Sequence, residues 1–201
     1  MAAAKELRQL KHNTSLDIGS SRPAAHAITP ARPLRSPTPP PDRLASAYER
    51  AKEYTKAIEY LGRSLALATE LGDRPGVADC LGGLGGAHAQ RGEHGKAIEY
   101  YARQLAVAEE LGETRRVAGS LSRLGHAYDR TAAYAKAVEH HKRALALEEE
   151  LGDRRAQAAS LSALGDAFDG LADDAQAIDC HSRAHTLKEE LAEPVGGEEK
   201  E

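Results

Sequence analysis

The feature that most constrains this chain is an internal repeat of fixed length. The tripeptide "LGD" at Leu71 returns as "LGE" at Leu111, "LGD" at Leu151 and "LAE" at Leu191, which are steps of 40 residues. The triplet "KAI" at Lys56 returns at the same step, and no gap is needed to align the copies. Self-similarity at one period is typical of a solenoid, in which each repeat packs against its neighbours. The period therefore predicts an array of similar units.

The pattern inside each copy predicts two helices. Apolar residues recur at three- and four-residue spacing, as in Leu161, Leu164 and Phe168 and again in Ala177 and Ile178. Hydrophobic residues make up 41% of the chain but aromatic residues only 4%, so Ala and Leu, both strong helix formers, must supply most of the core. An acid precedes arginine by four residues in every copy, the favourable order on a helix. These pairs are Glu59–Arg63, Glu99–Arg103, Glu139–Arg143 and Asp179–Arg183. We therefore expect an all-α protein.

Composition divides the 201 residues into three regions. Residues 1–42 hold seven of the nine prolines and six Lys/Arg against three Asp/Glu, which predicts a disordered basic arm. We expect residues 43–191 to form the array, with copies at about 43–80, 81–120, 121–160 and 161–191, and the composition of residues 192–201 predicts an acidic flexible tail. The segment "PARPLR" in the arm matches the spacing of a polyproline ligand, or is a chance match in a linker rich in Pro and Arg.

Charge and cysteine usage exclude several classes of protein. A net charge of −4 argues against nucleic acid as a partner, and no apolar run is long enough for membrane insertion. Cys80 and Cys180 form neither a CxxC pair nor a disulfide framework, which favours a reducing compartment and a cytoplasmic location. A mitochondrial transit peptide at the basic N-terminus is the alternative.

The stretch "LGGLGGAHAQRG" from Leu81 to Gly92 resembles a phosphate-binding loop but lacks its requirements. It does not complete the dinucleotide fingerprint, it has no GK[ST] ending, and the repeat frame places it on a helix. We interpret Gly85 as a close-packing position and Gly92 as a turn residue, which leaves Gly82, Gly83 and Gly86 unexplained. With no GxSxG motif and no catalytic cysteine pairing, the sequence predicts neither an enzyme nor a cofactor.

The repeated frame resembles the tetratricopeptide repeat. The second copy reads Leu84-Gly85, Ala87-His88, Gly92, Ala97 and Tyr101, and the equivalent positions recur in the third and fourth copies. The resemblance implies a right-handed superhelical solenoid of about four helix-turn-helix repeats that acts as a protein-binding scaffold or adaptor. The 40-residue period is similar to that of the Pins-type spindle-orientation adaptors and of tandem repeats in bacterial regulatory proteins. The asparagines that hold peptides in the Pins-type repeats are absent, since their positions carry Gly83, Arg123, Ala163, Gly86, His126 and Asp166.

Tetratricopeptide arrays are expected to curve so that the first helix of each repeat lines a concave groove. Residues spaced three and four apart on those helices should face the groove and bind a protein or peptide partner. The predicted groove residues are Asp79, Gly82, Gly86, Gln90, Ser122, Arg123, His126, Asp129, Arg130, Ser162, Asp166 and Asp169. Basic residues of the partner are expected near Asp166 and Asp169.

The histidines of the second helices allow a different hypothesis. His181 and His185 are four residues apart, and His141 occupies the same column as His181 in the neighbouring repeat, so a shared metal ion is conceivable. That column holds Leu61 and Tyr101 in the earlier copies, and no HExxH motif accompanies it. We therefore interpret these histidines as packing residues and predict no metal site.

Two further functions stay open at this stage. The array lacks polar capping helices, so its ends could self-associate, or the chain could be a fragment of a longer array. Alternatively, the array could serve as a sensor or regulatory module of a bacterial-type signalling protein.

Overall fold

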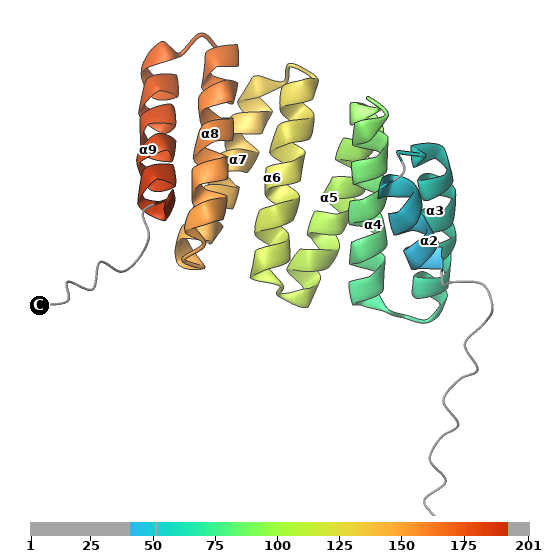
Figure 1. Ribbon diagram of the computed structural model, residues 1–201. Coiled ribbons are helices and arrows are strands. Elements are labelled where there is room, and N and C mark those ends of the chain that lie inside the picture. The colour runs from blue at the N-terminus through green and yellow to red at the C-terminus, as the bar shows by residue number, and fades with distance from the viewer. Residues whose placement is uncertain (1–40, 51, 193–201) are drawn as a thin grey trace, which may run out of the picture. The chain divides into compact units, whose positions relative to one another are not determined.

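The computed structural model describes residues 41–50 and 52–192, which are helical apart from short turns (Figure 1). The helices are α2 (Pro41–Arg50), α3 (Tyr54–Glu70), α4 (Arg74–Gln90), α5 (His94–Leu111), α6 (Thr114–Arg130), α7 (Tyr134–Glu150), α8 (Arg154–Gly170) and α9 (Asp174–Ala192). Each helix packs against the next in chain order, so they form four hairpins. The predicted all-α array of four repeats is confirmed. The "PARPLR" segment lies outside the described residues.

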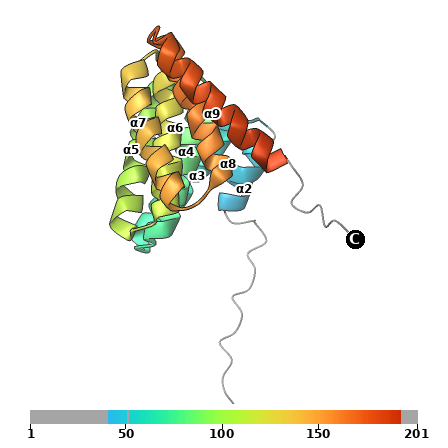
Figure 2. The same cartoon turned by 90° about the vertical axis from the view of Figure 1, so that its left-hand side faces the viewer.

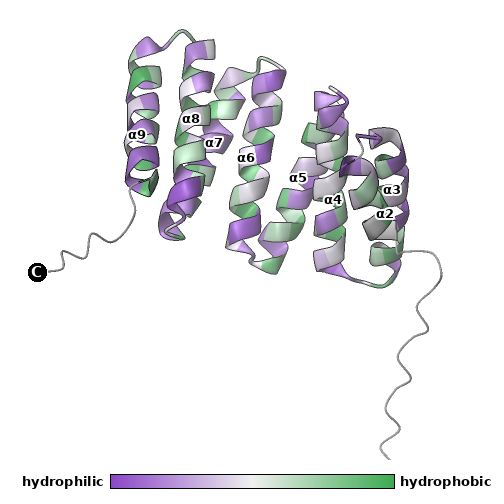
Figure 3. Cartoon of the chain, viewed as in Figure 1, coloured by the Kyte–Doolittle hydropathy of each residue, from purple (hydrophilic) through white to green (hydrophobic). Residues whose placement is uncertain are grey.

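The first helices of the hairpins lie together in one layer. Figures 1 and 2 show α4, α6 and α8 on one side of the array and α5 and α7 on the other, and α6 also contacts α8 directly. Hydrophilic and hydrophobic residues alternate along the helices in Figure 3, as expected where each helix buries only part of its surface. Small side chains make the close contacts: Ala57, Ala97 and Ala137 share one repeat column and are fully buried.

The recurring "LGD" tripeptide ends one hairpin and begins the next. Gly72 adopts a left-handed conformation with φ +68°, and the N–H of Asp73 then donates to the Ala68 carbonyl at 2.9 Å, which closes α3. The Asp73 carboxylate accepts a hydrogen bond from the N–H of Gly76 at 3.0 Å and caps α4. One short motif therefore supplies both helix ends.

These caps place the hairpins at 41–70, 74–111, 114–150 and 154–192, offset from the segments expected from the sequence. The expected boundaries near residues 80, 120 and 160 fall within α4, α6 and α8, because the chain changes hairpin at the Leu-Gly-acid turns. Gly92, with φ +76°, lies in the turn between α4 and α5 as predicted. Two of the predicted acid–arginine pairs form: Glu59–Arg63 at 2.6 Å and Asp179–Arg183 at 3.6 Å.

A glycine on each of three first helices faces a large side chain on the following helix. A Cβ atom added at Gly85 would lie 2.5 Å from Cε1 of Tyr101, too close for any real contact. Added Cβ atoms at Gly125 and Gly165 would overlap the rings of His141 and His181 in the same way. The predicted role of Gly85, to let two helices approach closely, is confirmed.

We expect Gly85→Ala to destabilise the array. Overpacking against Tyr101 costs about 1–3 kcal/mol, more than the gain of up to about 1 kcal/mol from replacing a helical glycine. Gly62→Ala is the matched control, because a Cβ at this exposed position of α3 meets nothing within 4 Å and should stabilise the protein. Urea unfolding of both variants tests this. Equal effects of the two substitutions would contradict the packing role of Gly85.

Gly82 of α4 faces the side-chain amide of Gln104 in α5, and this contact gives a second prediction. A Cβ at Gly82 would overlap the amide of Gln104, whose Nε2 donates to the Ala78 carbonyl at 3.1 Å. Gly82→Ala should therefore lower the free energy of unfolding in the wild-type background. The same substitution should raise it by about 1 kcal/mol in a Gln104→Ala background, where only helix propensity remains. A double-mutant cycle measures this change of sign, and simple additivity would refute it.

Candidate functional site

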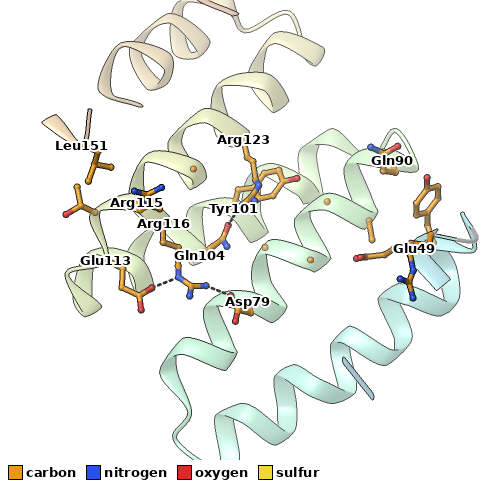
Figure 4. Close-up of a pocket in the computed structure, with 18 residues that line it drawn as sticks. Glu49, Asp79, Gln90, Tyr101, Gln104, Glu113, Arg115, Arg116, Arg123 and Leu151 are labelled. Atoms are coloured by element: carbon orange, nitrogen blue, oxygen red, sulfur yellow. Dashed lines mark hydrogen bonds and ion pairs between the residues drawn. The ribbon is translucent and has the colours of Figure 1, made fainter. Parts of the chain in front are cut away.

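A cleft with a volume of about 1190 Å³ opens on the layer of first helices (Figure 4). We call it the glycine groove, because four glycines contribute to its wall. Its residues come mainly from α2, α4, α5 and α6. They are Glu49, Arg50, Tyr54, Asp79, Gly82, Gly83, Gly86, Ala87, Gln90, Tyr101, Gln104, Glu113, Thr114, Arg115, Arg116, Gly119, Arg123 and Leu151.

The floor of the glycine groove has room for a ligand side chain. A Cβ at Gly86 would meet only the Tyr101 hydroxyl, at 3.8 Å, and one at Gly119 would meet nothing within 4 Å. Tyr101 is buried, and burial raises the pKa of its hydroxyl, which therefore stays protonated as a hydrogen-bond donor. The glycines that sequence analysis left unexplained thus divide into two kinds: Gly82 and Gly83 pack against Gln104 and Leu61, while Gly86 faces open space.

The wall of the groove is built around a buried amide. Gln104 is 3% exposed, and its Oε1 accepts a hydrogen bond from Nη1 of Arg123 at 3.4 Å while its Nε2 donates to α4. Arg116 bridges Asp79 of α4 and Glu113, as the dashed lines of Figure 4 show, and these hydrogen bonds raise the pKa of Arg116. The bridge joins the second hairpin to the third across the floor of the groove.

The four arginines of the groove differ in how far their charge is neutralised. Arg116 has its two carboxylates, and Arg115 lies 3.5 Å from the carboxylate of Asp153. Within residues 41–50 and 52–192, no carboxylate pairs with Arg123. On the opposite wall, burial raises the pKa of Glu49. Arg50 likewise has no carboxylate partner among the described residues, and of the two unpaired cations Arg123 is the one that a hydrogen bond to Gln104 holds in the wall.

A smaller cleft of about 510 Å³ lies toward the C-terminal end, between α6, α8 and α9. We call it the C-terminal groove. It is lined by His126, Arg155, Ala158, Ala159, Ser162, Ala163, Asp166, Lys188, Leu191 and Ala192. Lys188 Nζ donates to the hydroxyl of Ser162 at 2.7 Å and ties α9 to α8.

The predicted groove residues separate into three groups in the structure. Five of them line the glycine groove: Asp79, Gly82, Gly86, Gln90 and Arg123. Three line the C-terminal groove: His126, Ser162 and Asp166. Four line neither groove: Ser122, Asp129, Arg130 and Asp169.

Sequence analysis missed Gln104, Tyr101 and Arg116 as groove residues, because all three were outside the stripe expected on the first helices. A signal for Gln104 existed. Its column holds Ser64, Ala144 and Ala184 in the other copies, and only the copy with the large Gln104 has a glycine at position 82 where the next two have serine. A large residue in one column that coincides with a glycine in another column indicates that the two positions are in contact.

The histidines of the second helices face aspartates of their own hairpins. Nε2 of His141 lies 3.0 Å from Oδ2 of Asp129, and Nε2 of His181 lies 3.2 Å from Oδ2 of Asp169. His185 pairs instead with Glu189, at 3.3 Å. The shared site considered for His181 and His185 is thus replaced by two separate histidine–aspartate contacts.

None of the helices in the described part of the chain combines the length and apolar character needed to cross a membrane. No curated protein sequence matches the chain. Solved structures with the same fold do. BtubC (BKLC) from P. vanneervenii is 24% identical with a TM-score of 0.73, covering 80% of this chain and 66% of BtubC.

Two further structures share the arrangement of helices. A Rap protein complexed with competence and sporulation factor is 19% identical with a TM-score of 0.66, covering 75% of this chain and 42% of Rap. Aspartyl phosphate phosphatase F from Bacillus subtilis is 15% identical with a TM-score of 0.70, covering 76% of this chain and 40% of that protein. This chain therefore spans less than two thirds of each of the three. The family model for the tetratricopeptide repeat matches residues 41–110 and 116–190, so the chain belongs to the tetratricopeptide repeat family.

Proposed function

We propose that this chain is a non-enzymatic adaptor whose glycine groove binds an extended segment of a partner protein. Tetratricopeptide repeat domains are generally protein–protein interaction modules and are typically non-catalytic. The observation that carries the proposal is the open floor at Gly86 and Gly119, where the helix backbone is left uncovered inside a cleft of about 1190 Å³. A cleft of this size, with uncovered backbone between polar walls, suits a peptide segment.

The chemistry of the wall indicates what the bound segment carries. Arg123 lacks a carboxylate partner in the described residues and lies beside the buried Gln104 amide, so a carboxylate of the ligand is the complementary group. Arginine and a carboxylate form the stronger, charge-assisted kind of hydrogen bond. A basic residue further along the same segment would face Asp166, whose side chain is exposed in the C-terminal groove. We therefore propose a ligand with an acidic residue at one end and a basic residue at the other.

The relatives support the proposal at the level of the fold. The Rap protein was solved as a complex with competence and sporulation factor, and this chain shares the fold of 42% of that protein. The alternative, a regulatory module of a bacterial-type signalling protein, has the shared fold as its support. The finer resemblance to Pins-type adaptors stays a prediction. The asparagine positions carry Arg123 in the glycine groove and His126 in the C-terminal groove, which gives the two grooves a different ligand chemistry.

We expect Gly86→Trp to abolish peptide binding without unfolding the array. The indole would occupy the open floor above Tyr101, while Gly62→Trp, which adds the same side chain at an exposed position outside the groove, should leave binding unchanged. Peptides are first selected on the full chain from a random phage-displayed library. Fluorescence anisotropy of the selected peptides then gives their affinity for each variant.

The charge of the selected peptides gives a second readout from the same experiment. Arg123→Gln should weaken peptides that carry an acidic residue by about ten-fold, because a hydrogen bond between charged groups is worth about 1.5–3 kcal/mol. If the peptides bind Gly86→Trp as tightly as the wild type, the glycine groove is not their binding site. Loss of binding in both tryptophan variants would point to a general effect on the fold.

Self-association is the second candidate function, and one observation favours it. Val138 of α7 is buried by the next hairpin, whereas Ile178, the equivalent residue of α9, is 66% exposed. Leu171, at the turn before α9, is 46% exposed. The face of α9 is thus shaped like the face that α7 presents to α8, and a first helix of a second copy would fit it. Such head-to-tail contact would extend the array.

Sedimentation velocity over a range of concentrations tests self-association. If α9 binds a second copy, the wild-type sedimentation coefficient should rise with concentration, and Ile178→Lys should abolish the rise by placing a charge in the contact. The control is Gln176→Lys, which adds the same charge at an exposed polar position on the other side of the same helix and should leave the rise in place. A concentration-independent wild-type coefficient would rule out this candidate.

A further inference from the structure

Three potential metal ligands meet between α6 and α7, beside the C-terminal groove. They are His126 and Asp129 of α6 and His141 of α7, and one ligand atom from each lies within 4.8 Å of the others. We call these three residues the histidine cluster. The equivalent columns hold Gly86, Ala89 and Tyr101 in the preceding repeat, so the ligand set is not a general property of the frame.

The buried half of the histidine cluster is already in place for coordination. His141 is fully buried, and its Nε2 lies 3.0 Å from Oδ2 of Asp129. Oδ1 of Asp129 and Nδ1 of His141 are both buried without a hydrogen-bond partner in the described structure. A buried carboxylate oxygen that lacks a donor is costly, and a cation is one way to satisfy it.

The exposed half of the cluster is His126. The ring of His126 packs edge-on against that of His141, with centroids 4.9 Å apart, and His126 is exposed on the side of the C-terminal groove. Nitrogen and oxygen ligands at the usual zinc distances lie about 3.3 Å from each other in a tetrahedral site. The contact between His141 and Asp129 is near this spacing, and a ligand atom of His126 lies within 4.8 Å of both residues.

We propose that His126, Asp129 and His141 bind one divalent transition-metal ion of the zinc class. Two imidazoles and one carboxylate are a donor set that such ions prefer over Mg²⁺ or Ca²⁺. Three protein ligands leave the fourth tetrahedral position open toward the C-terminal groove, where water or a ligand group completes the shell. The site is separate from the glycine groove and does not depend on peptide binding there.

The neighbouring repeat provides an internal comparison. Its equivalent residues are Asp166, Asp169 and His181, with an aspartate in place of the first histidine. His181 is 41% exposed at its side chain, whereas His141 is fully buried. One imidazole fewer and greater exposure make this second set the poorer ligand for a zinc-class ion, so the proposal is confined to the histidine cluster.

Isothermal titration of the full chain with ZnCl₂, after removal of metal with EDTA, tests the proposal. The wild type should bind one ion in a saturable step, and zinc should raise the melting temperature because a preformed site exists only in the folded state. His126→Ala and Asp129→Asn should each weaken this step by at least about ten-fold. His141 is left intact, because its ring packs against Gly125 and its removal would disturb the fold.

Two control variants separate the histidine cluster from other zinc ligands. His185→Ala removes an exposed imidazole outside the cluster, and Asp169→Asn removes the aspartate equivalent to Asp129 in the next repeat. Both should retain the wild-type affinity. The proposal is overturned if the wild type shows no saturable binding, if His126→Ala and Asp129→Asn bind zinc as the wild type does, or if His185→Ala abolishes binding. Melting temperatures measured without metal show whether each variant is folded.

Discussion

The close approach of the two helices in each hairpin is the constraint on which the rest of this array depends. In three consecutive repeats a glycine of the first helix lies directly under a ring of the second: Gly85 under Tyr101, Gly125 under His141 and Gly165 under His181. Any side chain at the glycine would separate the helices. Because every hairpin packs on the next, such a separation would be passed to its neighbours and would alter the grooves along the first helices.

The same packing column also determines what the grooves offer a ligand. A ring seated over the glycine is long enough for its polar end to reach the layer of first helices. The Tyr101 hydroxyl therefore reaches the floor of the glycine groove, while the imidazole of His141 reaches Asp129. One difference in a packing column, tyrosine in one repeat and histidine in the next, thus replaces a neutral hydrogen-bond donor at a groove floor with a buried imidazole that faces Asp129. Packing and function are not separable at this position.

The sequence predicted the fold because every copy of the repeat carries the same evidence for one local structure. The helix pairs, the turn at Gly92 and the packing of Gly85 all followed from alignment of the copies. Contacts that occur in only one copy were harder to predict from the sequence. The bridge from Arg116 to Asp79 and the placement of Gln104 under Arg123 depend on side-chain paths between hairpins, which periodicity does not specify. The exposure of Ile178 was not predicted either. Its column predicts burial, but in the described residues no further hairpin packs against α9 to cover it.

The division of chemistry along the array follows from how a solenoid is stabilised. Each repeat contacts chiefly its neighbours, so a polar group in one repeat needs compensation only within about one repeat of its position. Arg115 and Arg116 at the start of the third hairpin are neutralised by Asp79, Glu113 and Asp153. Those charges place no demand on the histidines beside the C-terminal groove. A single scaffold can accordingly carry an anion-binding wall at one end and a nitrogen-rich cluster toward the other, and each can be altered by substitution while the other is retained.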